Sequence, residues 1–298
     1  MKYTNKFLYP EPFARAVTLD TYDKGEADFT VSELISPPRL RQLVSRHDAD
    51  ITVDVSERLW IIMGTVAHDI LERAGKEGQE LTEERLYATV AGKKVGGKLD
   101  TLCLTSGLMT DYKVTSAWSY VFGDKPEWER QLNAYAFLAR ENGHKVEALQ
   151  IFAMFRDWSP SKSLTSDDYP KTNCLCIPIP MWTHDEARIY LAGRVLAHST
   201  ASTCPDDDLV PCTPEERWAK KTTYAVMKPG RKSALSVHDT EQEAWKAMGQ
   251  GLTVETRPGK SVRCESYCAA RDFCNVWKND PTNHSTAAVS EITAGVTP

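Results

Sequence analysis

The sequence contains no uninterrupted apolar run of the roughly 18 residues that a membrane-spanning helix needs. Its first residues, MKYTNKFLYPEPFARAV, lack the apolar core of a secretory signal peptide. The chain also has no tandem repeat and no phosphate-binding GxxxxGK(S/T) loop, which excludes solenoids and a built-in ATP-driven helicase. We therefore expect a cytoplasmic chain that makes no use of a membrane.

The sequence also lacks a large excess of charge of one sign. It has 36 Lys and Arg residues and 41 Asp and Glu residues, for a formal net charge of −5. The chain has 298 residues, of which 41% are hydrophobic and 26% charged. This composition is typical of one large globular domain or two ordinary ones, and it excludes collagen-like, coiled-coil and wholly disordered proteins. The mild acidity argues against a surface covered with nucleic acid but is compatible with a local basic groove.

The sequence predicts six segments. An irregular lead-in spans residues 1–30, and a core follows over 31–203. A linker rich in Pro and Asp, CPDDDLVPCTPEE, covers 204–216. Beyond it we expect a basic ββα insertion at 217–256, a cysteine-rich closing segment at 257–279 and a disordered tail at 280–298.

Within the core, hydrophobic periodicity predicts an alternation of helices and strands. Helices are expected over 56–74, with Ser56 as N-cap, over 127–142 and over 183–199, with Thr183 as cap. Strands are expected over 85–91, 94–104, 107–115 and 147–158. This order predicts an α/β fold, a sandwich with a mixed central sheet flanked by helices.

Two expected strands carry charged residues that a purely structural strand would avoid. Asp111 and Lys113 are two residues apart, so they lie on one face of their strand. Asp100 lies near Asp111 if the two strands pair as a hairpin around Ser106 and Gly107. Buried carboxylates must be paired or bind an ion, and oxygen ligands of this kind suit Mg²⁺ or Mn²⁺.

The flanking helices add further candidates at helical spacing. Gly64, His68 and Glu72 are each four residues apart, and the absence of a side chain at Gly64 would allow a neighbour to approach closely. On the helix after the strands, Gln131 and Tyr135 share one face. A histidine or a tyrosine at such positions is by itself more often a packing residue.

Together, these motifs resemble the PD-(D/E)XK nuclease superfamily and, within it, the RecB-like exonucleases. That group includes the RecB and AddB nuclease domains, the CRISPR-adaptation exonucleases and phage relatives. The matching motifs occur in the family's order: Gly64-x3-His68-x3-Glu72, Gly97-x2-Asp100, Asp111-Tyr112-Lys113 and Gln131-x3-Tyr135. The resemblance implies a restriction-endonuclease-like sandwich, a chain encoded by a phage or mobile element, and location in the host cytoplasm.

The resemblance also implies a role for each matched residue. His68, Asp100, Asp111 and the backbone carbonyl of Tyr112 would hold the metal. Lys113 would orient and activate the attacking water. Three further residues would assist, with Gln131 and Tyr135 positioning the DNA backbone and the lysine, and Glu72 binding metal through water or fixing the histidine.

Eight cysteines in a reducing compartment favour thiols or metal ligands over disulfides. Cys264, Cys268 and Cys274 form a C-x3-C-x5-C cluster, for which Cys212 is the best fourth ligand and Cys204 the reserve. The cluster resembles the iron–sulfur staple of the AddB and CRISPR-adaptation enzymes. It departs from them in two respects: no cysteine precedes the histidine helix, and the tight pair is separated by three residues rather than two. A [4Fe–4S] cluster, a zinc ion and an absence of metal stay open.

The insertion and its flanks are the most basic part of the chain. They carry Arg217, Lys220, Lys221, Lys228, Arg231, Lys232, Lys246, Arg257, Lys260 and Arg263. Because phosphate contacts require cations but little special geometry, this segment could guide a DNA strand, or it could be an ordinary solvated surface.

The sequence thus predicts a metal-dependent DNA exonuclease acting in recombination or DNA degradation. A helicase or a single-strand annealing or binding protein is the expected protein partner. Two alternatives are a catalytically silent module on the same fold that binds DNA or a host protein, and a structure-specific or RNA-directed endonuclease.

Overall fold

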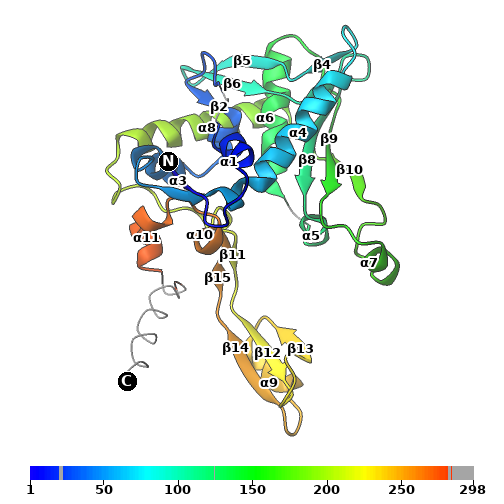
Figure 1. Cartoon of the computed structure of the whole chain (residues 1–298), viewed down its shortest axis with the longest axis vertical. Coiled ribbons are helices and arrows are strands. Elements are labelled where there is room, and N and C mark those ends of the chain that lie inside the picture. Colours follow the sequence, from blue (N-terminus) through cyan, green and yellow to red (C-terminus); the bar gives the residue numbers. More distant parts are fainter. Residues whose placement is uncertain (20–22, 124, 281–282, 284–298) are drawn as a thin grey trace. The chain divides into compact units, whose positions relative to one another are not determined.

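The computed structural model of the chain (Figure 1) describes residues 1–19, 23–123, 125–280 and 283. The chain divides into two compact units. The first comprises Met1–Ser36 and Thr52–Thr203, and the second comprises Pro37–Ile51 and Cys204–Pro298. The expected core of 31–203 therefore gains the N-terminal residues and loses residues 37–51, which pack with the C-terminal part of the chain.

The largest sheet of the first unit is mixed. Its strand order is β10-β9-β8-β7-β4, in which the β8–β9 pair is parallel and the other pairs are antiparallel. The strands are β4 (Glu80–Thr82), β7 (Thr101–Cys103), β8 (Leu108–Thr115), β9 (Ala148–Phe155) and β10 (Cys174–Ile179). Parallel neighbours need a crossover connection, and a helix supplies it here. The expected α/β class with a mixed sheet is thus confirmed.

A second sheet of the first unit has the order β2-β6-β5, formed by β2 (Phe29–Thr30), β6 (Lys93–Lys98) and β5 (Arg85–Val90). The expected strand over 94–104 is therefore two strands in two sheets, because the chain turns between β6 and β7. At this corner the Glu83 N–H donates to the Asp100 carbonyl at 3.0 Å, and the Leu99 N–H donates to the Glu84 carbonyl at 3.0 Å. Asp100 thus lies where the chain passes from one sheet to the other.

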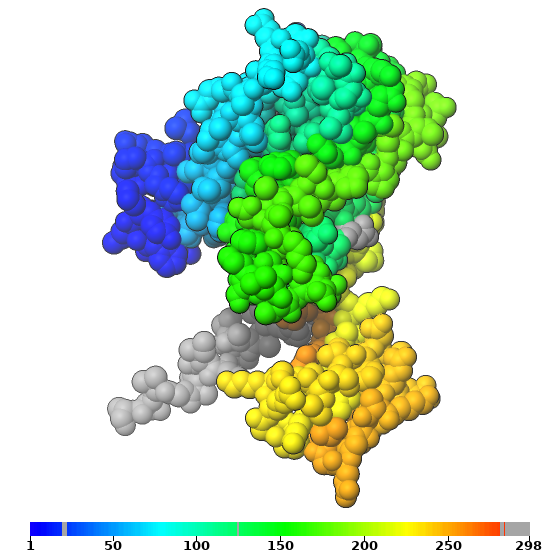
Figure 2. Space-filling model, turned by 90° about the vertical axis from the view of Figure 1, so that its right-hand side faces the viewer, coloured from blue at the N-terminus to red at the C-terminus, as the bar shows by residue number. Residues whose placement is uncertain are grey.

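Helix α4 (Leu59–Ala74) packs against β8 and lies on the surface of the first unit, where Figure 2 shows it in light blue. It begins later than expected, after a 3-10 turn over Val55–Arg58. The N-cap of that turn is Asp54 rather than Ser56, because the Asp54 carboxylate accepts the Ser56 N–H at 3.1 Å. A carboxylate at this position also interacts favourably with the partial positive charge at the start of the helix.

The crossover helix α6 (Pro126–Glu141) supplies much of the core. Residues 132–139 are all buried, and α6 contacts both sheets and α8 (His184–Thr203). The expected helix over 183–199 thus runs four residues further. Thr183 lies at its start as expected, since the Thr183 hydroxyl accepts the Glu186 N–H at 3.2 Å.

The expectation of an irregular lead-in over residues 1–30 is wrong. Strand β1 (Lys2–Thr4) pairs in parallel with β3 (Thr52–Asp54), and α1 (Glu11–Thr18) packs on α4. Such a strand is stabilised by a partner about 50 residues away, which local periodicity does not reveal. Three short helices complete the first unit: α2 (Val31–Ile35), α5 (Ala117–Val121) and α7 (Pro160–Thr165).

The second unit contains the basic insertion, which has one strand more than the expected ββα pattern. Its sheet has the order β13-β12-β14, because the insertion's last strand returns beside the first, and α9 packs on it. The unit's elements are α3 (Pro38–Arg46), β11 (Ala219–Lys220), β12 (Thr223–Met227), β13 (Ser236–His238), α9 (Glu241–Ala247), β14 (Thr253–Arg257), β15 (Lys260–Ser261), α10 (Val262–Ser266), a 3-10 turn (Arg271–Phe273) and α11 (Asn275–Lys278).

Most of the expected disordered tail, 280–298, lies outside the described residues. Within the described part of the chain, every helix is too short or too polar to cross a bilayer.

Candidate metal centre and substrate cleft

A cleft of about 850 Å³ in the first unit gathers half of the residues expected at the active site. Its walls come from α4, from the corner between the sheets and from α6. Residues of the family-like motifs that line it are Gly64, His68, Glu72, Gly97, Asp100 and Tyr135. Residues of three motifs, spread over about 70 residues of sequence, thus meet in this cleft, whereas Asp111, Lys113 and Gln131 are not among its lining residues.

Strand β8 places Asp111 and Lys113 on the same face, as their spacing predicts. The Lys113 Nζ atom lies 2.6 Å from Asp111 Oδ2, and the Asp111 side chain is almost fully buried at 3% exposure. The Lys113 side chain keeps 25% exposure, so its ammonium group remains accessible from outside. This ion pair compensates part of the charge of a carboxylate that has lost its water.

Asp100 approaches β8 from the corner between the sheets. Its Oδ2 atom accepts the backbone N–H of Tyr112 at 2.7 Å, next to Asp111. Burial, together with the negative charge of Asp111, raises the pKa of Asp100 to about 7. Without a cation, these two carboxylates are therefore costly to keep ionised together. The expected role of the Tyr112 carbonyl as a metal ligand stays a prediction, since the recorded contact uses its N–H.

His68 on α4 completes a compact group with Asp100 and a residue that the sequence did not indicate, Glu83. The His68 Nδ1 atom lies 3.1 Å from Glu83 Oε1 and 3.4 Å from Asp100 Oδ1. One ligand atom from each of the three residues lies within 4.8 Å of the other two. The hydrogen bond with Glu83 is the main cause that raises the pKa of His68.

Glu83 is held by its backbone and by a second ion pair. Its φ of +51° is uncommon for a residue other than glycine and belongs to the bend between β4 and β5. Its other oxygen, Oε2, lies 2.5 Å from Lys98 Nζ. One carboxylate oxygen therefore faces the histidine. Glu72, for which we expected that place, is exposed and only lines the cleft.

Helix α6 contributes the remaining motif. Gln131 Nε2 donates to the Tyr135 hydroxyl at 3.3 Å, and burial raises the pKa of Tyr135, which keeps the phenol neutral. The Tyr135 ring lies against Gly97 of β6, where an added Cβ would be 2.7 Å from Tyr135 Cε1. Close packing against Tyr135 therefore explains the glycine at position 97. The expected close approach of a neighbour to Gly64 is not found, since a Cβ there would meet no atom within 4 Å.

We expect Gly97→Ala to lower the free energy of unfolding by about 1–3 kcal/mol, because the Tyr135 ring would have to move. Gly64→Ala is the matched control and should raise it by about 0.5–1 kcal/mol, because alanine favours a helix interior and no neighbour is displaced. Urea unfolding curves measure both changes. Equal losses in the two variants would contradict this explanation of Gly97.

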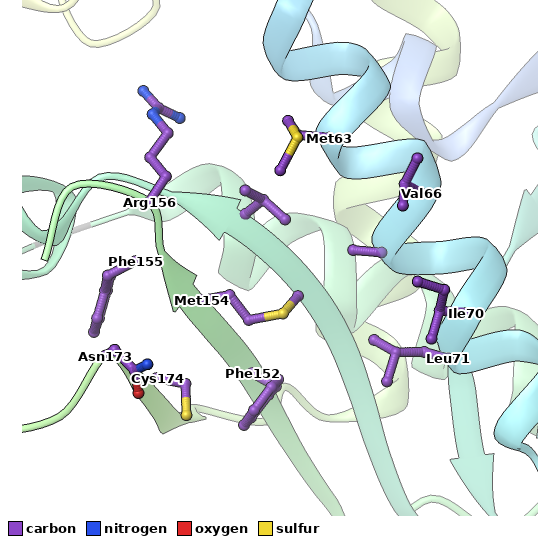
Figure 3. A pocket seen from close by; sticks show the side chains of 12 residues that line it. Met63, Val66, Ile70, Leu71, Phe152, Met154, Phe155, Arg156, Asn173 and Cys174 are labelled. Atoms are coloured by element: carbon purple, nitrogen blue, oxygen red, sulfur yellow. The ribbon is translucent and has the colours of Figure 1, made fainter.

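The opposite flank of α4 borders an apolar groove of about 560 Å³, shown in Figure 3. Met63, Val66 and Ile70 face it from the helix, and Phe152 and Met154 face it from β9. The helix that carries His68 therefore separates two different surfaces, a polar cleft and an apolar groove.

In the second unit, the four expected cysteine ligands come close together. Burial, together with the charges of Glu216, Cys264, Cys268 and Cys274, raises the pKa of Cys212 to about 12. Burial also raises the pKa of Cys264 to about 11. Among the described residues, however, no three of these sulfur atoms lie within 4.8 Å of one another. Thiolates around a tetrahedral zinc ion would be only about 3.8 Å apart.

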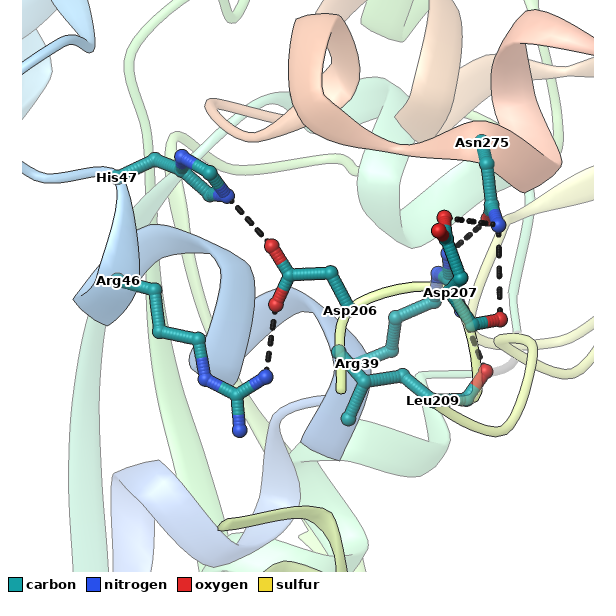
Figure 4. A network of polar contacts seen from close by, with 7 residues as sticks. All are labelled: Arg39, Arg46, His47, Asp206, Asp207, Leu209 and Asn275. Atoms are coloured by element: carbon teal, nitrogen blue, oxygen red, sulfur yellow. Dashed lines mark hydrogen bonds and ion pairs between the residues drawn. The ribbon is translucent and has the colours of Figure 1, made fainter. Parts of the chain in front are cut away.

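A buried arginine lies beside this group. Arg39 of α3 is 2% exposed, and its Nε atom donates to the Cys274 sulfur at 3.3 Å. Its other donors bond the Leu209 carbonyl and the Asn275 side chain, as Figure 4 shows. Among the described residues, none of the recorded acceptors of this guanidinium is a carboxylate. An arginine so deeply buried normally has an anionic partner.

A second polar contact ties α3 to the same unit. Asp206 accepts from Arg46 Nη1 at 2.7 Å, and its other oxygen lies 2.7 Å from His47 Nε2 (Figure 4). The His47 ring stacks on Phe273 with 4.2 Å between centroids. Residues 37–51 therefore belong with the cysteine segment rather than with the sheets.

No protein-family model matches the chain, and no curated protein matches it. Among solved structures, the chain is similar to that titled "Crystal structure of SSO0001". The two share 16% sequence identity at a TM-score of 0.40, over 62% of this chain and 81% of the other.

Proposed function

We propose that this chain is a divalent-metal-dependent deoxyribonuclease of the RecB-like PD-(D/E)XK type that degrades DNA from its ends. The observation that carries the proposal is the convergence of Asp100, at the corner between the sheets, with the Asp111–Lys113 ion pair on β8 and with His68 on α4. A packed core has no use for two nearly buried carboxylates, one of which has its pKa raised to about 7. A bound cation would give them a use.

The donor set fits a hard divalent cation. His68, Asp100 and Asp111, with the Tyr112 carbonyl, would hold it, and Glu83 is an additional candidate ligand. These are oxygen donors with one imidazole, which suits Mg²⁺ or Mn²⁺ better than a soft metal. When bound, such an ion stabilises negative charge on phosphate oxygens and lowers the pKa of a bound water.

The remaining residues would bind and orient the substrate. Lys113, whose ammonium group remains accessible, can hold the attacking water and offset charge that develops on the scissile phosphate. Tyr135 is neutral and fixed by Gln131 and by Gly97, so it can position the lysine or a phosphate oxygen through hydrogen bonding. Glu83 would also fix the orientation of the His68 ring through its hydrogen bond with Nδ1.

One assay separates this proposal from its alternatives. Wild-type protein is incubated with end-labelled linear DNA and closed circular DNA in Mg²⁺ or Mn²⁺. We expect loss of the linear DNA only. Cutting of circles would instead indicate an endonuclease, and a preference for RNA would indicate an RNA-directed enzyme. Binding of DNA without hydrolysis in either metal would favour the catalytically silent module.

We further propose that Cys212, Cys264, Cys268 and Cys274 hold an iron–sulfur cluster. The sulfur atoms are grouped, yet they are more widely spaced than a single zinc ion requires. The buried Arg39 beside Cys274 supports an anionic centre, because four thiolates around such a cluster carry a net negative charge. Its function would be to close the second unit, in the way that structural metal sites stabilise small domains.

The insertion offers a second candidate surface for binding DNA. Lys228, Arg231 and Lys232 are all exposed at the turn between β12 and β13 of the insertion. Each phosphate contact that they make would add to the salt dependence of binding. The participation of a helicase or a single-strand binding protein stays a prediction.

A further inference from the structure

A cluster of exposed aromatic rings lies at the edge of the main sheet where β8 and β9 end. The two parallel strands finish in register, with Thr115 opposite Phe155. Beyond this pair, the Arg156 N–H donates to the Thr115 carbonyl at 2.9 Å. The Asp157 carboxylate accepts from the Ser116 hydroxyl at 2.5 Å and from the Ala117 N–H at 2.7 Å. The segments that follow β8 and β9 are therefore fixed to each other.

The segment after β8 carries the rings of Trp118 and Phe122, the segment after β9 carries Arg156 and Lys162, and a third ring, Trp60, belongs to α4. Lys162 Nζ lies 4.8 Å from the centroid of the Trp118 ring, and Arg156 Cζ lies 4.3 Å from that of Trp60. Phe122 stacks on Trp118 with 5.8 Å between centroids and 25° between planes. We call these five residues the edge platform.

The rings of the edge platform are unusually open to solvent. Phe122 is 77% exposed, Trp60 is 48% exposed and Trp118 is 39% exposed. Single exposed aromatic residues are common, but stacked rings with two cations form a distinct combination. The rings offer flat faces for stacking, and Arg156 and Lys162 offer positive charge.

The edge platform continues the strand that carries the proposed catalytic lysine. Thr115 is two residues beyond Lys113, and Ser116 begins the helix that carries Trp118. At about 3.3 Å per strand residue, the end of β8 lies on the order of 7 Å from Lys113 along the strand. A DNA strand bound at Lys113 that follows β8 toward Thr115 would reach the platform within a few nucleotides.

We propose that the edge platform binds unpaired nucleobases of a DNA strand held in the cleft, by stacking on Phe122 and Trp118. Stacking requires a base face, which a duplex hides in its interior, so the platform favours single-stranded DNA. The two cations match the phosphates of such a strand, whereas a purely apolar protein surface would gain nothing from them. This inference rests on the proposed function, because it assigns a path to that function's substrate.

The test measures binding in EDTA, so that no hydrolysis is needed. A fluorescent oligothymidylate is compared with an abasic strand of equal length, which keeps the phosphates but has no bases. We expect wild-type protein to bind the oligothymidylate more tightly. Phe122→Leu, which keeps an apolar side chain but removes the ring, should weaken this binding by about five- to 100-fold and leave the abasic strand unaffected.

Phe122→Tyr, which keeps a ring, should restore the preference for bases. Leu164→Ala is the control for loss of an apolar side chain, since Leu164 is 86% exposed on α7 and has no ring. Equal binding of the two strands by wild type, or equal effects of Phe122→Leu on both, would overturn the proposal. So would tighter binding of a blunt duplex than of the single strand.

Failure of the proposed function would be visible separately. If DNA is never hydrolysed but the base-dependent binding persists, the nuclease proposal fails and the edge platform stands. If DNA is hydrolysed and the abasic strand binds as tightly as the oligothymidylate, the platform fails and the nuclease stands.

Discussion

Replacement of Lys113 by alanine is expected to lower DNA hydrolysis by about 10²- to 10³-fold, the usual cost of losing one group that stabilises developing charge. The ammonium group of Lys113 lies 2.6 Å from the buried carboxylate of Asp111. No other described residue on β8 can replace it. The rate of release of labelled nucleotides from linear DNA measures the effect.

The variant also leaves the Asp111 carboxylate buried without its ion pair, so loss of activity must be separated from loss of fold. Added Mn²⁺ should raise the unfolding temperature of Lys113→Ala more than that of wild type, because the cation would compensate the same carboxylate. Lys145→Ala is the matched control, since Lys145 forms an exposed ion pair with Glu147. Wild-type rates in Lys113→Ala would contradict the assignment of the active site.

Lys113→Arg distinguishes charge from geometry. The guanidinium keeps the positive charge, but it is larger, planar and more weakly hydrated than an ammonium group. We therefore expect activity well below wild type although the ion pair with Asp111 survives. Full activity in Lys113→Arg would show that charge alone is required.

The sequence predicts the candidate site where local rules determine side-chain direction. Asp111 and Lys113 share a face because strands alternate, and Gln131 contacts Tyr135 because helices repeat every 3.6 residues. Glu83 could not be predicted in this way. Its carboxylate reaches His68 only because the chain bends at a residue with positive φ and then changes sheets at Leu99 and Asp100.

Long-range pairings explain the other differences. Strand β1 exists because β3 lies beside it, and α3 joins the second unit because Arg39 contacts residues more than 160 positions away. Neither partner can be identified from a window of neighbouring residues. The same reason accounts for β14, the insertion's third strand, since its register is set by β12.

The cysteine group leads to the second large expected effect. Cys268→Ser should remove the bound metal and markedly lower the free energy of unfolding of the second unit, because structural metal sites stabilise the small domains that hold them. Protein purified without oxygen should show the broad visible absorption of an iron–sulfur cluster, with iron and sulfide in the elemental analysis. Cys176→Ser is the control, since Cys176 is exposed on β10 in the first unit. Zinc in place of iron would refute the cluster, and retained metal in Cys268→Ser would refute the ligand.

The effect of Arg39→Leu on the free energy of unfolding depends on whether the cysteine group beside Arg39 is neutral or negatively charged. If the four cysteines are neutral thiols, then Arg39→Leu replaces a buried, uncompensated guanidinium with an apolar side chain, which is often neutral or stabilising. If they surround an anionic cluster, the same change removes its compensating charge and should cost about 3–5 kcal/mol. Both states are measured on one protein, before and after the metal is stripped with a chelator. The loss of hydrogen bonds to Leu209 and Asn275 is common to both states and cancels in the difference.

We expect Arg39→Leu to destabilise the loaded protein much more than the stripped one. Arg46→Leu, at an exposed ion pair with Asp206, is the control and should affect the two states equally. Equal effects of Arg39→Leu in both states would mean that the arginine serves packing and not the cluster.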